Sequence, residues 1–224
     1  MSDSIIAIIL GIVEGFTEYL PVSSTGHMIL VGDMLGFTGP RASVFEIFIQ
    51  LGAILSVVII YKEKFTRMLH QYRCWNLLQP KNWFRNDTGL TLAHIAAGII
   101  PVMGIGYLAH HAIKTYLFST GTVIIGLIIG GLFLGLSRKA AADFSFIIAV
   151  PVMIVACFYD LLKSLSDLNS NDLIMIVIGF ITAFIVAYVS VLWFLKFMNR
   201  STLASFAYYR FIVAAISFIY FFIF

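Results

Sequence analysis

Residues 14 to 28, EGFTEYLPVSSTGHM, gather acidic, hydroxyl and imidazole side chains inside an otherwise apolar part of the chain. Glu14 and Glu18 stand four residues apart. On a helix they would share one face, where two like charges repel unless a proton or a cation lies between them. Ligation by oxygen atoms alone suits Mg²⁺ or Ca²⁺, which often share their coordination with water and a substrate phosphate. The glutamate pair therefore predicts a divalent-metal site.

The hydroxyl run Ser23, Ser24 and Thr25 falls where a new helix would begin after the proline of the motif. Free backbone N–H groups and the positive end of the helix dipole converge at such a position, which favours an anion. We therefore expect Ser23, Ser24 and Thr25, with Gly26 beside them, to bind an anionic substrate. His27 lies within reach of a neighbouring hydroxyl or a leaving-group oxygen, so it can carry a proton. Together these groups indicate phosphoryl transfer.

The composition defines the environment of this motif. Hydrophobic residues make up 61% of the 224 positions and charged residues 11%, far from the balance of a soluble domain. The sequence predicts an integral membrane protein. No basic residue precedes the first apolar run, but Asp3 does, so we do not expect a cleaved signal peptide. Cys74 and Cys157 lack the spacing of metal ligands, and neither is assigned a role.

Two stretches, 115–137 and 173–195, contain no charged residue and exceed the roughly 20 residues that a helix needs to cross a membrane. Four further apolar runs are shorter or partly polar, and they reach span length when their flanking residues extend to the interface. They are 47–60, 90–107, 144–159 and 211–224. We therefore expect about six transmembrane helices.

The basic residues orient these spans. Six of them fill the segment between the first and second spans, which the positive-inside rule places in the cytoplasm. They are Lys62, Lys64, Arg67, Arg73, Lys81 and Arg85. The N-terminal motif then faces the opposite side, which is the periplasm in a bacterium.

The motif itself does not read as a simple span. Pro21 interrupts it, and the run Ser-Ser-Thr-Gly favours caps and turns over helix interior. We predict two half-helices, residues 4–20 and 25–37, that form a re-entrant pair entering and leaving on the same side. Non-helical backbone at membrane depth is tolerated only beside protein or a watery cavity, so a polar cavity is expected.

Simpler interpretations exist for each part of the motif. The hydroxyl run can be only a helix N-cap, His27 only a satisfied interfacial histidine, and Glu14 or Glu18 only a hydrogen-bond partner between helices. Ionisable groups inside membrane segments are costly and usually functional. Two carboxylates beside this turn therefore favour a functional site.

Four runs of the sequence closely resemble the undecaprenyl-diphosphate phosphatase family of bacitracin-resistance proteins. They are EGFTEYLPVSSTGH at 14–27, FEIFIQLGAILSVV at 45–58, LSRKAAADFSFIIAVPVM at 136–153 and YRFIVAA at 209–215. The resemblance implies hydrolysis of undecaprenyl diphosphate to the monophosphate at the periplasmic face of the bacterial inner membrane. This reaction recycles the lipid carrier of peptidoglycan precursors.

The same resemblance implies roles for individual residues. Glu14 and Glu18 would help bind Mg²⁺ or Ca²⁺, and Ser24 and His27 would be central to catalysis, with Glu18 beside them. The nucleophile stays open between Ser24 and an activated water. Undecaprenyl diphosphate and membrane lipids are the expected partners, a homodimer is left open, and no nucleic-acid partner is expected.

The chain departs from the family in one region. Family members carry a second motif, PGxSRSGxT, on a second re-entrant pair, and its arginine is thought to clamp the diphosphate. No such string occurs here. The run VIIGLIIGGLFLGLSRKAAADF at 123–144 passes directly to the sequence that follows the motif, so the join lies near Gly130 and Gly131.

An internal repeat agrees with this gap. GDMLGF at 32–37 parallels GLFLGL at 131–136, and an arginine followed five positions later by an acid recurs at 41–46 and 138–143. Each half then continues into three expected spans, which gives two inverted repeats. The predicted fold is thus an all-α membrane protein with one N-terminal re-entrant pair and the second pair largely missing.

We treat residues 1–224 as a single membrane domain. It comprises the re-entrant motif region at 1–43, the spans of the first repeat at 44–136 and those of the second at 137–224. Three functions stay open at this point. They are a phosphatase, a polyprenyl-phosphate lipid-binding or transport protein, and a catalytically impaired remnant of the family.

Overall fold

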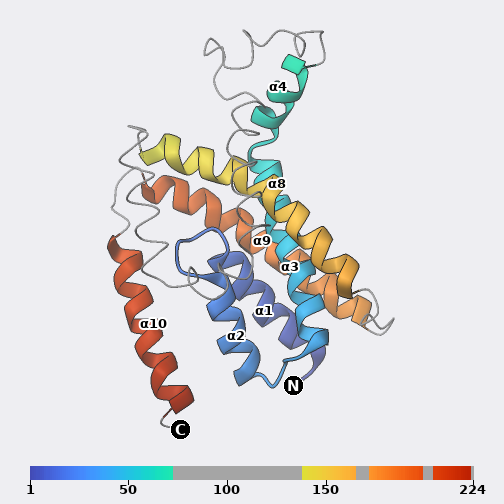
Figure 1. Ribbon diagram of the computed structural model, residues 1–224, viewed down its shortest axis with the longest axis vertical. Helices are drawn as coiled ribbons and strands as arrows, with labels where there is room; N and C mark the ends of the chain where they lie inside the picture. Colours follow the sequence, from blue (N-terminus) through green and yellow to red (C-terminus); the bar gives the residue numbers. More distant parts are fainter. Residues whose placement is uncertain (73–137, 165–171, 199–203, 223–224) are drawn as a thin grey trace. The chain divides into compact units, whose positions relative to one another are not determined.

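The computed structural model describes residues 1–72, 138–164, 172–198 and 204–222 (Figure 1). All regular structure in these ranges is helical, which confirms the expected all-α class. The expected spans 90–107 and 115–137 lie outside the described residues. The contacts divide the chain into two compact units, Met1–Ile60 with Met153–Phe224, and Tyr61–Val152.

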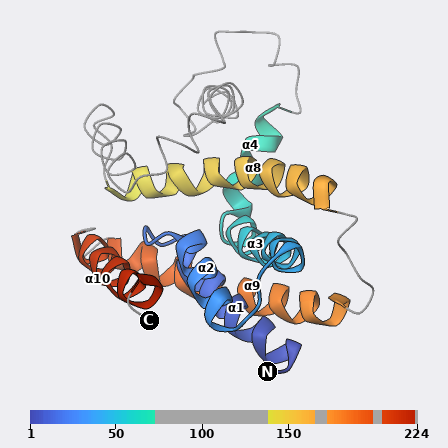
Figure 2. The same cartoon turned by 60° about the horizontal axis from the view of Figure 1, so that its bottom comes forward.

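The first unit contains most of the described helices. They are α1 (Asp3–Thr17), α2 (Ser24–Met34), α3 (Pro40–Ile60), α9 (Leu173–Met198), α10 (Ala204–Phe222) and the C-terminal part of α8 (Arg138–Ser164). Both α1 and α3 pack along α9, as Figures 1 and 2 show from two directions. The second unit holds α4 (Lys62–Tyr72) and the N-terminal part of α8.

Two helices, α3 and α9, are long and apolar enough to cross a membrane. They contain the expected spans 47–60 and 173–195, and α3 begins at Pro40, whose fixed φ suits the first turn of a helix. They agree with the membrane protein that the apolar composition predicts. The arrangement of six spans in inverted repeats stays a prediction.

Small residues allow α1 and α9 to pack backbone to backbone. A Cβ atom on Gly11 would lie 2.8 Å from the carbonyl oxygen of Gly179, and one on Gly15 would lie 2.6 Å from that of Ala183. Small residues spaced four apart on both helices permit this approach, as at many membrane helix interfaces. Gly52 allows α3 to pack equally closely on α9, since a Cβ atom on it would lie 2.5 Å from the carbonyl oxygen of Phe180 in α9.

The predicted pair of half-helices is present, with shorter bounds than expected. The helix α1 ends at Thr17 and the next begins at Ser24, so the chain leaves the helix before Pro21, whose ring disfavours helical backbone ahead of it. The helix α2 ends at Met34 because Gly36, with φ +65°, closes it. The N–H of Phe37 donates to the carbonyl of the third-last helical residue over 2.8 Å, which completes a Schellman motif.

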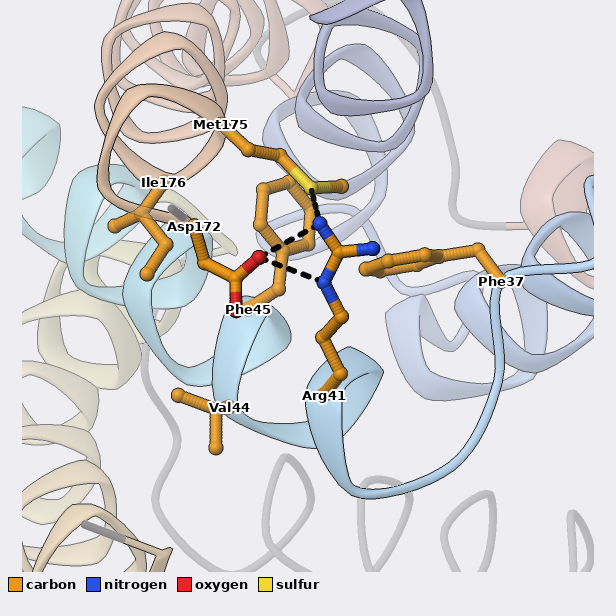
Figure 3. Close-up of a pocket in the computed structure, with 7 residues that line it drawn as sticks. All are labelled: Phe37, Arg41, Val44, Phe45, Asp172, Met175 and Ile176. Atoms are coloured by element: carbon orange, nitrogen blue, oxygen red, sulfur yellow. Dashed lines mark hydrogen bonds and ion pairs between the residues drawn. The ribbon is translucent and has the colours of Figure 1, made fainter. Parts of the chain in front are cut away.

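Arg41 ties the starts of three helices together. Its Nη2 lies 2.6 Å from a carboxylate oxygen of Asp3 at the start of α1 and 2.6 Å from one of Asp172 just before α9. The guanidinium also lies 5.5 Å from the ring centroid of Phe37 (Figure 3). Asp172 is only 7% exposed, so the arginine neutralises a buried charge. This ion-pair cluster holds α1, the start of α3 and α9 in register.

Candidate active site

The two glutamates of the N-terminal motif lie one helical turn apart, as their spacing predicts. Glu14 belongs to the last turn of α1 and is 4% exposed, while Glu18 is the C-cap residue and is partly buried. The N–H of Glu18 donates to the carbonyl oxygen of Glu14 over 2.9 Å. Two carboxylates on one turn, one of them buried, form an arrangement that a proton or a cation would stabilise.

The donor set suits a hard cation. Within the described residues, no group of three or more His, Cys, Asp and Glu side chains gathers as a protein-only metal centre would require. Mg²⁺ is usually held by one or two carboxylates and takes its other ligands from water and substrate phosphates. The Glu14 and Glu18 carboxylates fit this pattern, and they stay the predicted metal ligands.

Ser24 reaches back across the break between α1 and α2. Its hydroxyl donates a hydrogen bond to Oε2 of Glu18, so a hydroxyl and a carboxylate of the motif meet. A hydroxyl beside a base is the arrangement that activates a serine nucleophile. Ser23 occupies the N-cap position but makes no side-chain cap hydrogen bond. The hydroxyl run is therefore more than a helix N-cap.

The carboxylate of Glu18 has a second partner, which the sequence did not indicate. Gln50 of α3 donates from Nε2 to Oε1 of Glu18 over 3.3 Å, and its own Oε1 accepts a hydrogen bond from the thiol of Cys157 over 3.2 Å. One weak signal was available, because Gln50 is a polar residue inside the apolar helix α3. Cys157 gave no signal at all.

His27 makes two hydrogen bonds through its ring. Its Nδ1 lies 2.8 Å from the carbonyl oxygen of Ser23, and its Nε2 lies 2.8 Å from the hydroxyl of Tyr209 on α10. A carbonyl only accepts, so Nδ1 carries the hydrogen and Nε2 holds the lone pair in the neutral ring. The run YRFIVAA contains Tyr209 but indicates no role for it. Among the described residues, His27 hydrogen-bonds to Ser23 and Tyr209 and not to Ser24.

The remaining predicted site residues lie at the start of α2. Ser23, Thr25 and Gly26 are exposed there, next to the free N–H groups of the first turn. A Cβ atom on Gly26 would lie 3.3 Å from Oγ of Ser23, so the glycine leaves room beside that hydroxyl. Their contact with substrate stays a prediction.

The backbone of Ser23 is also unusual, because its φ of +70° lies in the left-handed region. Among the described residues it is the only one other than glycine with a positive φ. This conformation costs a residue with a side chain about 1–2 kcal/mol. The backbone carbonyl of Ser23, which holds His27 in place, is presented by this strained turn.

Comparison with known proteins identifies the relatives of this chain. The family model of the bacitracin resistance protein BacA matches residues 7–135 and again residues 128–216. The two matches overlap around Gly130 and Gly131, at the join where the sequence places the missing region.

Individual relatives match over nearly their whole length. The chain is 40% identical to undecaprenyl-diphosphatase 1 of Bacillus thuringiensis (strain Al Hakam), with 96% of this chain and 97% of that protein covered. It is 37% identical to the undecaprenyl-diphosphatase of Nitratidesulfovibrio vulgaris (strain DP4), with the same two shares covered. The first alignment spans 265 positions, more than the 224 residues of this chain, so the relative holds a stretch that this chain lacks.

Proposed function

Because this chain belongs to the bacitracin resistance protein BacA family, we propose that it hydrolyses undecaprenyl diphosphate to undecaprenyl phosphate and inorganic phosphate. The reaction would recycle the lipid carrier for peptidoglycan synthesis and confer bacitracin resistance. One structural observation carries this proposal beyond the family assignment. The hydroxyl of Ser24 and the carboxylate of Glu18 form a hydrogen bond although they come from opposite sides of the break between two helices.

The geometry supports Ser24 as the nucleophile. Glu18 takes the hydroxyl proton as Oγ of Ser24 bonds to the terminal phosphorus, and the bond from that phosphorus to the bridging oxygen breaks. Undecaprenyl phosphate leaves with that oxygen. Water then attacks the phosphoserine, releases phosphate and restores the hydroxyl. His27, anchored on Ser23 beside this pair, is the group that can exchange a proton during these steps.

The negative charge of the diphosphate requires cations or hydrogen-bond donors around it. Glu14 and Glu18 would hold Mg²⁺ or Ca²⁺, which when bound neutralises phosphate charge. Ser23, Thr25 and Gly26 present hydroxyl and backbone N–H groups at the start of α2, where the helix dipole favours an anion. These groups form the proposed phosphate cradle.

We also propose the membrane arrangement that the site needs. The pair α1 and α2 would be re-entrant and open to the periplasm, within about six spans arranged as inverted repeats in the bacterial inner membrane. The basic segment from Lys62 onward supports a cytoplasmic location for the opposite side. A homodimer is compatible with this arrangement.

The test is phosphate release from a C15 or C55 isoprenyl diphosphate by the full chain purified in detergent, with and without EDTA. We expect release that EDTA abolishes and that Ser24→Ala reduces by about a thousandfold or more, as loss of a catalytic nucleophile does. Ser43→Ala is the matched control, because Ser43 is an exposed serine whose hydroxyl donates to the carbonyl of Gly39, one turn earlier. No release from folded protein would refute the proposed function, and full activity of Ser24→Ala would refute Ser24 as nucleophile.

A further inference from the structure

Two side chains, Cys157 and Gln50, connect by hydrogen bonds to the catalytic carboxylate, on the other side from Ser24. The hydrogen-bonded chain runs from Cys157 on α8 through Gln50 on α3 to Glu18, and it ends at the hydroxyl of Ser24. The members lie 107, 32 and 6 residues apart in sequence, so only the packing of the helices brings them together. All of them belong to the same compact unit.

The amide of Gln50 has one orientation that satisfies both of its neighbours. The carboxylate of Glu18 accepts hydrogen bonds, so the NH₂ end must face it, while the thiol of Cys157 is a donor and must face the amide oxygen. Rotating the amide by half a turn would place its oxygen against the carboxylate. Cys157 is 1% exposed, so no water competes for this thiol. The carboxylate and the thiol therefore favour the same orientation of the amide.

The two oxygens of Glu18 are consequently distinguished. Gln50 donates to Oε1, which leaves Oε2 facing the hydroxyl of Ser24. Without the amide, the carboxylate would be free to rotate about its last torsion, because that torsion has broad minima. A base held in one orientation works better than one that samples several.

We propose that Gln50 is a positioning residue, which orients the carboxylate of Glu18 toward Ser24, and that the thiol of Cys157 stabilises this orientation of the Gln50 amide. This inference rests on the proposed phosphatase function. Neither residue touches the substrate. The simpler alternative is that Gln50 is only a hydrogen-bonded polar group in an apolar helix. It predicts that replacing Gln50 lowers stability without a specific effect on turnover.

The first test compares turnover with substrate affinity. Gln50→Leu replaces the amide by an apolar side chain. We expect kcat to fall by about 10- to 100-fold, as for a lost hydrogen bond to a charged group. KM stays within about twofold, since Gln50 does not contact substrate. Ser56→Ala is the matched control, because Ser56 is a buried polar residue of α3 whose hydroxyl donates to the carbonyl of Ala53 in the same helix. An unchanged kcat, or a loss carried by KM, would overturn the proposal.

The second test asks whether Cys157 acts through Gln50. Cys157→Ala removes the donor and lowers kcat by about 2- to 10-fold, whereas Cys157→Ser keeps a donor and restores the rate to within about twofold. In the Gln50→Leu background, Cys157→Ala has no further effect, because the two changes interrupt the same chain. Independent, multiplicative losses would refute the link.

A third readout does not depend on activity. With Cys74 replaced by serine, Cys157 is the sole thiol of the chain, and its S–H stretching band reports its hydrogen bond. We expect this band to move to higher frequency in Gln50→Leu, as it does when a thiol loses its acceptor. If the parent protein released no phosphate, the proposed function would fail, and the band would still test the hydrogen bond between Cys157 and Gln50. An unchanged band would overturn that link.

Discussion

The Nε2 atom of His27 lies 2.8 Å from the hydroxyl of Tyr209, which is 182 residues further along the chain. The two rings are almost parallel, with 3° between their planes and 5.6 Å between their centroids. Because Nδ1 is committed to the carbonyl of Ser23, Tyr209 faces the one nitrogen of the neutral ring that can accept a proton. Tyr209 and the carbonyl of Ser23 therefore both hold the ring of His27.

Replacing Tyr209 by Phe tests this contact. The ring of His27 loses one of its two hydrogen bonds, worth about 0.5–1.5 kcal/mol, so kcat for phosphate release should fall by about 2- to 10-fold. Tyr208→Phe is the control, because Tyr208 is 71% exposed on the same helix. Equal rates for the two variants would show that His27 does not depend on Tyr209.

The metal ligands are tested by charge removal without change of volume. Glu14→Gln keeps the shape of a buried side chain but removes one anionic ligand, so half-maximal activity should need at least about 10-fold more Mg²⁺ or Ca²⁺. The measurement is phosphate release against metal concentration after treatment with EDTA. Glu63→Gln serves as the control, since its side chain is 79% exposed on α4. A metal dependence that is the same in both variants would contradict ligation by Glu14.

Because α1 and α9 approach closely, we expect a change from glycine to alanine in α1 to lower stability, the reverse of its usual effect in a helix. Alanine normally stabilises a helix relative to glycine by about 0.5–1 kcal/mol. At Gly15 the added Cβ would lie 2.6 Å from a backbone oxygen of α9, so Gly15→Ala should instead destabilise by about 1–3 kcal/mol.

Thermal unfolding in detergent measures this effect as a lower melting temperature. Ile12→Ala is the comparison on α1, because Ile12 is 46% exposed and does not pack between the helices. A melting temperature for Gly15→Ala at or above that of the parent would mean that α1 and α9 are not in backbone contact.

The ion-pair cluster around Arg41 predicts that its two acids, Asp172 and Asp3, contribute unequally to the stability of the fold. Arg41→Met leaves the buried carboxylate of Asp172 without its cation, and breaking such a pair costs about 3–5 kcal/mol. Asp3→Asn removes an acid whose side chain is 54% exposed, so it should cost no more than about 1 kcal/mol. Melting temperatures of the two variants give the comparison, and similar losses would contradict the unequal burial of the acids.

Local rules were sufficient for much of this protein. An apolar composition implies membrane helices, and Pro21 with the serines after it implies a break between two of them, because backbone preferences act over a few residues. The turn-by-turn spacing of a helix likewise places Glu14 and Glu18 together. These features were predicted from the sequence, and the structure confirms the helices, the break and the pairing of the glutamates.

The boundaries were predicted less well. The half-helices end at Thr17 and Met34, three residues before each expected end. The second shortening follows from Gly36, whose left-handed φ permits the Schellman motif, and the pattern of apolar residues does not report such a turn.

Only the tertiary structure decided the partners of the motif. Gln50, Cys157 and Tyr209 lie 32 or more residues from the groups that they bind or orient, and no periodicity links positions that far apart. Their meeting depends on the packing of the helices that carry them within the first unit, which is set by side-chain volume and by small residues such as Gly15. Sequence spacing describes one helix at a time, whereas a site shared by several helices depends on the packing between them.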